Sequence, residues 1–298
     1  MYPSLKFTCK LTSPFHTSDR NYSNLYTCAP YIMGSTLRGA VLRCLIDRYC
    51  ARIHDLHEDN PCYHGKCGES CPVKPLFFPP TRFSFGHFSE GKSDVAVYTR
   101  VGISRDRDAA AEGGLVSVEV RRGKFTFEVV YSDVGLEPYI HEGVMLAGCR
   151  RDVGIGRFRS VGWGQFDVLR CEYAGRSMPA RARKYVFEFR TPYVLPEEAS
   201  GGEIPKATFR DQLQKALLPD TSPVPYIDKI ETMIPSFSYV RRWSDEKGFK
   251  ENRLVADIGS KLAVMFSEDV DPEHLYLWQW GVGDWYEYGF GSFSSTVV

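Results

Sequence analysis

Long apolar stretches are missing from this sequence, which has no run of the roughly 20 residues that a helix needs to cross a membrane. The order of charged, apolar and small residues typical of a secretory signal is missing from the N-terminus. We therefore expect a cytoplasmic protein with no membrane partner. Net charge is missing too, because 37 Lys and Arg residues balance 37 Asp and Glu residues. The overall charge gives no argument about nucleic acid, and only local patches can supply one.

The cysteines do not form the pattern of a disulfide framework. There are nine of them, an odd number, in a chain with no export signal, and such chains usually keep their thiols reduced. Five lie in apolar or strand-like surroundings and are predicted to be small core residues: Cys9, Cys28, Cys44, Cys149 and Cys171. The length of 298 residues, with 43% hydrophobic and 25% charged residues, is typical of a globular protein of two domains.

One glycine spacing occurs twice in the chain. Residues 154–166 and 281–293 both read G-x-G-x5-G-x-G-x-F, with an aromatic residue between the last two glycines. All four glycines and the closing phenylalanine match at one offset, 281 − 154 = 127 residues. Such a match predicts an internal duplication in which each copy closes one domain.

The two copies differ in charge. The first carries Arg157 and Arg159 between its glycine pairs, and a flexible loop with exposed amides and two guanidinium groups suits a phosphate backbone. The second carries Asp284 and Glu287, which would repel phosphate. Around the first copy, residues 150–190 hold ten basic and four acidic side chains, a local excess of +6. The alternative is that the glycines only make tight turns before a strand.

A helix start follows the first polar segment. Residues 13–27 are polar and turn-rich and read as a loop, which holds His16 and Asp19. Gly34 then allows a turn, Ser35 is a suitable N-cap, and apolar residues at helical spacing predict a helix from about residue 36 to the low fifties. With Arg38 one turn in, the helix start is a candidate anion site. The alternative is a capped helix with an exposed arginine.

The segment after this helix is rich in metal-binding residue types. Its spacing is C-x11-C-x4-C-x3-C, with three histidines interleaved. Four thiols can hold zinc tetrahedrally, so we predict one structural zinc, with His57 or His64 as a substitute ligand. The spacing is not that of a standard zinc finger, and free thiols in a loop are the alternative. The predicted ligands are Cys50, Cys62, Cys67 and Cys71.

Strands and helices follow in the same order in both halves of the chain, which predicts an α+β fold. Strands are predicted at 5–11, 95–98, 125–131, 165–169, 185–190 and 262–266, and helices at 138–149, 209–217 and from 272. Residues 236–249 interleave aromatic and basic side chains, which suits single-stranded nucleic acid. Packing between the two domains could equally bury those rings.

Residues 31–40, YIMGSTLRGA, resemble the IPGSSLRGAL signature of the RAMP superfamily, the RNA-binding subunits of CRISPR effector complexes. Met33 stands where that family usually has proline. The glycine-rich loop is the family's other hallmark, and GISRDRDAAAEGGL at residues 102–115 resembles its GIxRxxxxAxEGxL segment. The resemblance implies two tandem ferredoxin-like (RRM-like βαββαβ) domains, each closed by a glycine-rich loop. These would be residues 1–173, with a Cys-rich insertion at 50–80, and residues 184–298.

The chain looks most like the Csx-type, two-domain RAMP subunit of type III-D complexes. The resemblance implies a non-catalytic subunit in antiviral defence that holds the 5′ handle of the guide RNA (crRNA). Its partners would be the large polymerase-cyclase subunit and neighbouring RAMP subunits. A hairpin bearing Arg100, Arg105 and Arg107 would lie along the RNA. The predicted RNA-binding residues are Gly34, Ser35, Arg38, Arg100, Arg105, Arg107, Gly154, Gly156, Arg157, Arg159, Gly162, Gly164, Arg241, Arg242 and Trp243.

Two enzymatic alternatives stay open. A RAMP endoribonuclease that processes precursor guide RNA needs a general base, and His16 is the candidate. A backbone RAMP subunit that cleaves target RNA needs an aspartate-bound metal, and Asp19 is the candidate.

Overall fold

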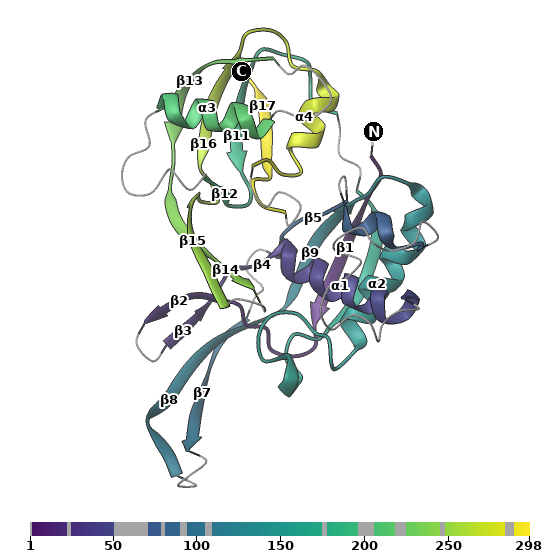
Figure 1. Cartoon of the computed structure of the whole chain (residues 1–298), viewed down its shortest axis with the longest axis vertical. Helices are drawn as coiled ribbons and strands as arrows, with labels where there is room; N and C mark the ends of the chain where they lie inside the picture. Colours follow the sequence, from purple (N-terminus) through teal and green to yellow (C-terminus); the bar gives the residue numbers. More distant parts are fainter. Residues whose placement is uncertain are drawn as a thin grey trace. The chain divides into compact units, whose positions relative to one another are not determined.

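The computed structural model describes most of the chain (Figure 1). The chain divides into two compact units, Tyr2–Ala174 and Gly175–Val298, and each is described by itself. No described helix is both long and apolar enough to span a bilayer. Only the backbone is described at 18–22, 100–104, 109–114, 207, 241–244 and 248–252. The described residues are 2–22, 25–50, 71–78, 81–89, 94–104, 109–174, 178–195, 206–217, 225–244, 248–283 and 289–298.

The first unit is built on a sheet of order β10-β1-β9-β6-β4, in which β5 also pairs with β9. Two helices, with the 3₁₀ turns η2 (Lys74–Phe77), η3 (Val134–Leu136) and η4 (Arg159–Val161), complete this unit. In chain order the elements of this layer are β1 (Ser4–Leu11), β4 (Tyr31–Ile32), α1 (Gly34–Tyr49), β5 (Arg82–Phe83), β6 (Gly86–Phe88), β9 (Lys124–Val130), α2 (Glu137–Cys149) and β10 (Phe166–Tyr173).

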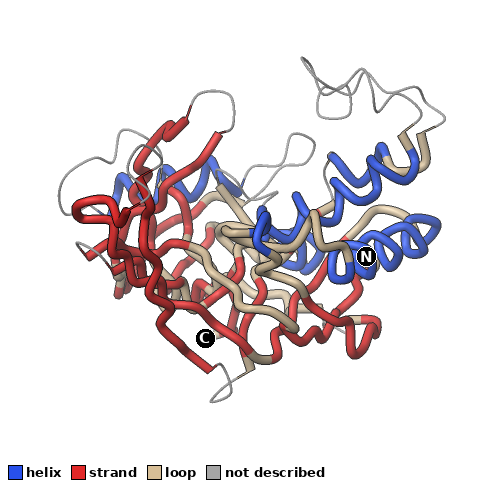
Figure 2. The backbone as a smooth tube through the Cα atoms, turned by 90° about the horizontal axis from the view of Figure 1, so that it is seen from below, coloured by secondary structure: helices blue, strands red, loops and turns tan. Residues whose placement is uncertain are grey.

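Helices α1 and α2 cover one face of this sheet (Figures 1 and 2). Alternation along β1 decides which face is buried, because Leu5, Phe7 and Cys9 are at most 2% exposed. The Phe7 ring stacks on that of Phe127 from β9, with centroids 5.2 Å apart. Burying each such ring contributes about 1.5–3 kcal/mol, so this face anchors the unit.

A second sheet of the first unit has the order β2-β3-β8-β7, from β2 (Ser18–Tyr22), β3 (Leu25–Cys28), β7 (Asp94–Ser104) and β8 (Ala109–Arg122). The β7–β8 hairpin extends away from the helices of its unit (Figure 1). The prediction that residues 13–27 form a loop is wrong, since β2 and β3 lie there. Their polar sequence lacks the apolar alternation that indicates a strand, and β3 forms because it pairs in parallel with β8.

The main strands, the hairpin and the two helices of the second unit follow in the same order as in the first. Its main sheet runs β17-β11-β16-β13, which matches β10-β1-β9-β6 in position and connectivity. Hairpin β14–β15 lies between β13 and β16 in the chain, as β7–β8 lies between β6 and β9. The elements are β11 (Lys184–Phe189), β12 (Tyr193–Val194), α3 (Lys206–Leu217), β13 (Ile227–Ile234), β14 (Phe237–Ser244), β15 (Gly248–Ala256), β16 (Lys261–Phe266), α4 (Pro272–Trp278) and β17 (Phe293–Val297).

The predicted helices are confirmed, with one correction at a cap. Helices α2, α3 and α4 lie where periodicity placed them, and Asp271 caps α4 by accepting from the Glu273 amide at 2.8 Å. Ser35 is not the N-cap of α1, because the helix begins at Gly34 and Met33 occupies the cap position without a side-chain bond. Ser35 is already inside the helix, so its side chain cannot act as a cap.

The core cysteines are confirmed at three positions and corrected at one. Cys9, Cys28 and Cys44 are buried, and burial raises the pKa of the Cys9 thiol to about 12. Such thiols are inert. Cys171 is half-buried, whereas Cys149 is exposed, because it is the last residue of α2 and its Sγ–H donates to the Leu146 carbonyl at 3.6 Å.

Candidate nucleic-acid interface

Residues 154–164, here called the first glycine frame, lie between α2 and β10. Residues with a Cβ disfavour a positive φ, so the spacing of the glycines shows where the backbone adopts that conformation. At Gly164 an added Cβ would lie 1.8 Å from the carbonyl oxygen of Ile155, so only glycine fits there. The φ angles are 48° at Gly154, 80° at Gly156, 83° at Gly162 and 78° at Gly164.

Backbone hydrogen bonds close the frame on itself and on the segment after β1. The Ile155 amide donates to the Gly164 carbonyl at 2.9 Å, and the Gly164 amide donates to the Pro14 carbonyl at 2.8 Å. The Arg157 amide donates to the His16 carbonyl at 2.8 Å. The predicted flexible loop with exposed amides is therefore wrong for these amides, which bond within the protein. The frame is a support for side chains.

Two arginines stand on this support. Arg157 and Arg159 are both exposed, and among the described residues neither guanidinium has a carboxylate partner. Phe158, between them, has a positive φ of 62° and packs on Trp163 with ring centroids 5.0 Å apart. Because Phe158 is anchored against the frame, its neighbours are held at the surface. Two guanidinium groups held at the surface can donate hydrogen bonds to phosphate oxygens.

Aromatic contacts join the frame to the β7–β8 hairpin. The Tyr98 ring of β7 lies 5.7 Å from the Trp163 ring, and the Tyr98 hydroxyl accepts from Arg122 Nη2 at 3.0 Å. Tyr98 is 37% exposed, Trp163 is half-buried and Arg122 is exposed. Rings beside cations suit bases beside phosphates. The sequence did not single out these residues, although an aromatic between the last two glycines of both copies was a usable signal.

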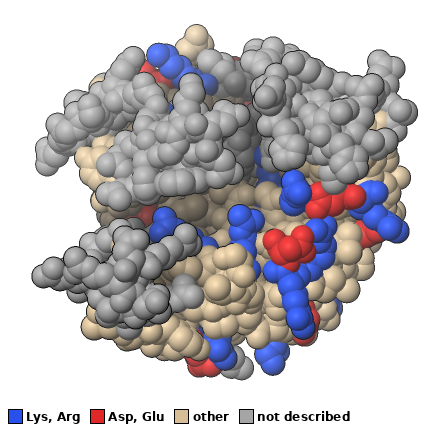
Figure 3. All heavy atoms as spheres, turned by 60° about the horizontal axis from the view of Figure 1, so that its bottom comes forward, with Lys and Arg blue, Asp and Glu red and all other residues tan. Residues whose placement is uncertain are grey.

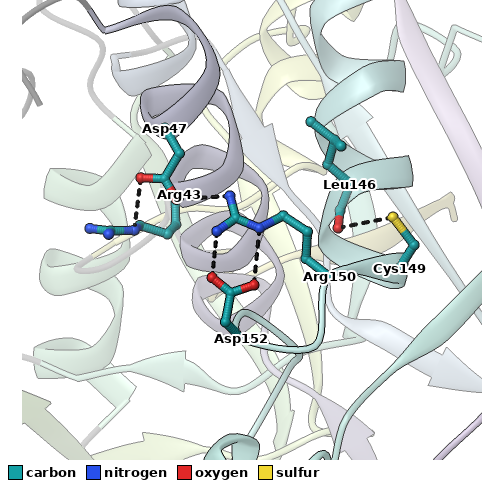
Figure 4. A network of polar contacts seen from close by, with 6 residues as sticks. All are labelled: Arg43, Asp47, Leu146, Cys149, Arg150 and Asp152. Carbon is teal, nitrogen blue, oxygen red and sulfur yellow. Dashed lines mark hydrogen bonds and ion pairs between the residues drawn. The ribbon is translucent and has the colours of Figure 1, made fainter.

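An ion-pair network fixes the segment just before the first glycine frame to α1 (Figure 4). The Arg150 guanidinium donates to Asp47 at 2.8 Å and through Nε to Asp152 at 3.1 Å, and Arg43 Nε lies 3.1 Å from Asp47. The hydrogen bonds from Arg150 lower the pKa of the Asp152 carboxyl. The Arg150 guanidinium is thus paired with two carboxylates. In this it differs from Arg157 and Arg159 of the frame.

Basic and acidic side chains are interspersed on the surface away from the frame. Figure 3 shows Lys and Arg side chains scattered over one face, several of them beside Asp or Glu side chains. This distribution agrees with the zero net charge of the chain. Any phosphate contact here depends on individual side chains, such as those of the first glycine frame, and not on one broad field.

His16, the candidate general base, is buried. It is 1% exposed, its Nδ1 lies 2.7 Å from the Glu119 carbonyl, and its ring lies 5.8 Å from that of Phe158. Burial lowers its pKa, opposed by the hydrogen bond to the Glu119 carbonyl and reinforced by the nearby Arg157 charge. The imidazole is therefore enclosed by the protein in this structure and is not open to solvent.

The lowered pKa of His16 predicts a stability that falls with acidification. The folded state favours the neutral ring, so its contribution is present above the unfolded pKa of about 6.5 and is lost as the pH falls through the lower folded pKa. Urea unfolding at about pH 7.5 and pH 5 measures this, and His16→Gln should reduce the difference between the two conditions. An equal difference in wild type and variant would rule out His16 as the cause.

Arg38 is buried, so the alternative of an exposed arginine at the start of α1 is wrong. It is 6% exposed and its Nη2 donates to the Phe77 carbonyl at 2.7 Å. The turn η2 packs over this part of α1, a contact between segments far apart in sequence. Gly34 is also buried and Ser35 is half-buried. The start of α1 is therefore held within the protein.

Other predicted site residues are placed only in part. Arg100 lies on β7 opposite Val116, and nothing is described of its side chain. The backbones of Arg241, Arg242 and Trp243 lie on β14, and that of Asp19 lies on β2. Those outside the described residues are Arg105, Arg107, Cys62, Cys67, His57, His64, Asp284 and Glu287.

The second glycine frame, residues 281–291, repeats the backbone of the first where it is described. An added Cβ at Gly291 would lie 2.1 Å from the Val282 carbonyl oxygen, the counterpart of the contact at Gly164. The Val282 amide donates to the Gly291 carbonyl at 3.3 Å. Shared spacing thus corresponds to shared geometry. The φ angles are 140° at Gly281, 81° at Gly283, 84° at Gly289 and 68° at Gly291.

Comparisons with solved structures give matches of low identity. One is a chain of "Cryo-EM structure of the Type III-B Cmr-beta bound to cognate target RNA", 18% identical, with 58% of this chain and 60% of that chain covered and a TM-score of 0.39. Another is "CRISPR associated protein Cas6", 12% identical, with 100% of both chains covered and a TM-score of 0.46. A third is Cmr6 from Pyrococcus furiosus, 13% identical, with 56% and 99% covered and a TM-score of 0.36.

Comparison by sequence gives a family. No protein of curated function matches the chain. A family model described as RAMP superfamily matches residues 8–167, which run from β1 through the first glycine frame into β10. Its 167 − 8 + 1 = 160 residues are more than half of the 298 in the sequence. The chain therefore belongs to the RAMP superfamily.

Proposed function

We propose that this chain is a cytoplasmic, non-catalytic RNA-binding subunit of a type III CRISPR effector ribonucleoprotein in antiviral defence. Membership of the RAMP superfamily supports the RNA-binding class. We also propose that the chain consists of two tandem ferredoxin-like domains, residues 1–173 and 184–298, each closed by a glycine frame. The matched strand orders β10-β1-β9-β6 and β17-β11-β16-β13 support this division.

The observation that carries the proposal is the pair of exposed arginines on the first glycine frame. Backbone bonds from Ile155 and Gly164 hold the frame, and Arg157 and Arg159 have no carboxylate partner among the described residues. A guanidinium binds phosphate oxygens through paired N–H groups. Tyr98 and Trp163, next to them, offer ring faces to unstacked bases. Together these groups suit single-stranded RNA.

The finer assignment is also a proposal. We assign the RNA to the 5′ handle region of the guide RNA, the complex to type III-D, and the neighbours to the large polymerase-cyclase subunit and other RAMP subunits. The motifs at residues 31–40 and 102–115 support the assignment. Arg100, Arg105 and Arg107 on and between β7 and β8 would extend the RNA contact along that hairpin.

The proposal predicts retention of RNA without cleavage. His16, the candidate base, is 1% exposed and hydrogen-bonded to Glu119, which argues against metal-independent cleavage. The test incubates the purified protein with CRISPR repeat RNA, with and without magnesium, and follows binding and chain length. Cleavage without metal would instead support a processing endoribonuclease, and magnesium-dependent cleavage would support a target-cleaving backbone subunit.

We further propose one structural zinc ion held by Cys50, Cys62, Cys67 and Cys71. Cys50 and Cys71, the two described members, both pack against the hydrophobic core of the first unit, so the ends of the segment are anchored on one core. Protein purified without added zinc should contain about one zinc per chain, and Cys62→Ser with Cys67→Ser should lose it. A zinc content far below one per wild-type chain would refute this site.

A further inference from the structure

A three-residue motif contacts each glycine frame. Ser13-Pro14-Phe15 follows β1, and Thr191-Pro192-Tyr193 follows β11. Both have a hydroxyl residue, a proline and an aromatic residue, at an offset of 191 − 13 = 178 residues. The glycine frames are related by a different offset of 127 residues, so the sequence distance between motif and frame differs between the two units.

The hydroxyl residue binds the amide after the last glycine in both units. Ser13 Oγ accepts from the Gln165 amide at 2.8 Å, and Thr191 Oγ1 accepts from the Ser292 amide at 2.8 Å. In return, the Gln165 carbonyl accepts from the Ser13 amide at 3.4 Å, and the Ser292 carbonyl accepts from the Thr191 amide at 3.3 Å. Each frame is thus latched at the residue that leads into its last strand.

The proline and the aromatic residue act at the same points in both units. The carbonyl of Pro14 accepts from the Gly164 amide at 2.8 Å, and that of Pro192 accepts from the Gly291 amide at 2.8 Å. The aromatic ring lies close to the second glycine of each frame: an added Cβ would be 2.8 Å from the Phe15 ring at Gly156 and 2.7 Å from the Tyr193 ring at Gly283. These backbone bonds and the ring contact therefore recur in both units.

The two latches differ in how many bonds they make. Thr191 is 1% exposed, and its hydroxyl also donates to the Gly289 carbonyl at 2.8 Å and lies 3.0 Å from Ser292 Oγ. Ser13 is half-buried, and within the described part of the chain its hydroxyl makes only the bond to Gln165. The frame that carries the exposed arginines is therefore latched by one side-chain bond, whereas the other is latched by a buried network.

We propose that Ser13 is a positioning residue for RNA binding, which rests on the function proposed above. Its hydroxyl holds the Gln165 amide and so fixes the frame from which Arg157 projects. The same segment holds the frame a second time, through the bond from the Arg157 amide to the His16 carbonyl. Loss of the Ser13 hydroxyl leaves the half-buried Gln165 amide without its side-chain acceptor, so only backbone bonds hold that end of the frame. The arginines then no longer meet successive phosphates at a preset spacing.

The experiment compares Ser13→Ala, Ser13→Thr and Thr191→Val in the full chain. Amide hydrogen exchange at Gln165 and at Ser292 reports each latch, and binding of a single-stranded RNA oligonucleotide reports function. Ser13→Ala should speed exchange at Gln165 and weaken RNA binding by about fivefold to tenfold. Ser13→Thr should keep both at wild-type values, because threonine makes the same bond in the second unit. Thr191→Val should speed exchange at Ser292 and leave RNA binding unchanged.

The affinities of these variants distinguish failure of the Ser13 proposal from failure of the proposed function. Equal loss of affinity in Ser13→Thr and Ser13→Ala would overturn the proposal even if one variant folds poorly, since only the alanine removes the hydroxyl. Wild-type affinity in Ser13→Ala together with weakened binding in Arg157→Ala/Arg159→Ala would overturn the latch and leave the proposed function standing. Wild-type affinity in both would overturn the proposed function.

Discussion

Replacing Gly164 with alanine is expected to disrupt the first glycine frame and abolish RNA binding. The positive φ of 78° strains any residue with a Cβ, and the added carbon would lie 1.8 Å from the Ile155 carbonyl oxygen. Relief requires movement of the backbone, which breaks the bonds from Ile155 to Gly164 and from Gly164 to Pro14. We expect a loss of roughly 3–5 kcal/mol in the free energy of unfolding.

A matched control separates the clash from the strain. Gly162 has a φ of 83°, yet an added Cβ there meets nothing within 4 Å. Gly162→Ala should therefore cost only the conformational strain, about 1–2 kcal/mol. Thermal and urea unfolding of both variants measure the difference, which should be roughly 5 °C or more in Tm. Equal destabilisation by the two substitutions would show that close backbone approach at Gly164 is not what holds the frame.

The double variant Arg157→Ala/Arg159→Ala is expected to weaken binding of single-stranded RNA by roughly 1–3 kcal/mol. Both side chains are exposed and lack carboxylate partners among the described residues, so their removal should leave the folded frame intact. Contacts to phosphate carry no sequence information, so the loss should be similar for oligonucleotides of different sequence. Filter binding at one fixed salt concentration, with unfolding curves recorded in parallel, measures both.

Two controls test whether position matters more than charge. Arg210→Ala/Lys215→Ala removes the same two positive charges from α3 in the second unit, and RNA affinity should change little. Asp284→Ala/Glu287→Ala removes acidic groups from the second glycine frame and should not weaken binding. A loss with Arg210→Ala/Lys215→Ala equal to that in the frame variant would mean that total charge, and not the glycine frame, determines affinity.

Local signals in the sequence predicted the parts of the fold that depend on neighbouring residues. Asp271 before Pro272 marks the start of α4 because a side-chain cap and a proline act within one turn. The spacing of Phe209, Leu213 and Leu217 predicted α3, and all three side chains are buried. Glycine spacing likewise indicated a repeated backbone path, because a positive φ restricts the residue type at that same position.

Local sequence signals did not predict contacts between segments that lie far apart in the chain. Arg38 is buried because η2 packs on α1, and His16 is buried because Glu119 and Phe158 enclose it. A hydrophilic residue carries no local sign that a later segment will cover it. The hydroxyl–proline–aromatic motif at Ser13 and Thr191 was present in the sequence, but only the three-dimensional pairing with the glycine frames reveals its role.

The salt dependence of RNA affinity tests the central claim most directly, namely that Arg157 and Arg159 on the first glycine frame bind phosphate. The measurement is the slope of log affinity against log salt concentration for wild type and for Arg157→Ala/Arg159→Ala, on one single-stranded RNA. Each phosphate contact contributes about 0.7 to this slope on a single strand. We predict a slope shallower by about 1.4 in the variant, for two lost contacts. If wild type and variant had the same slope and the same affinity at every salt concentration, the account would be contradicted.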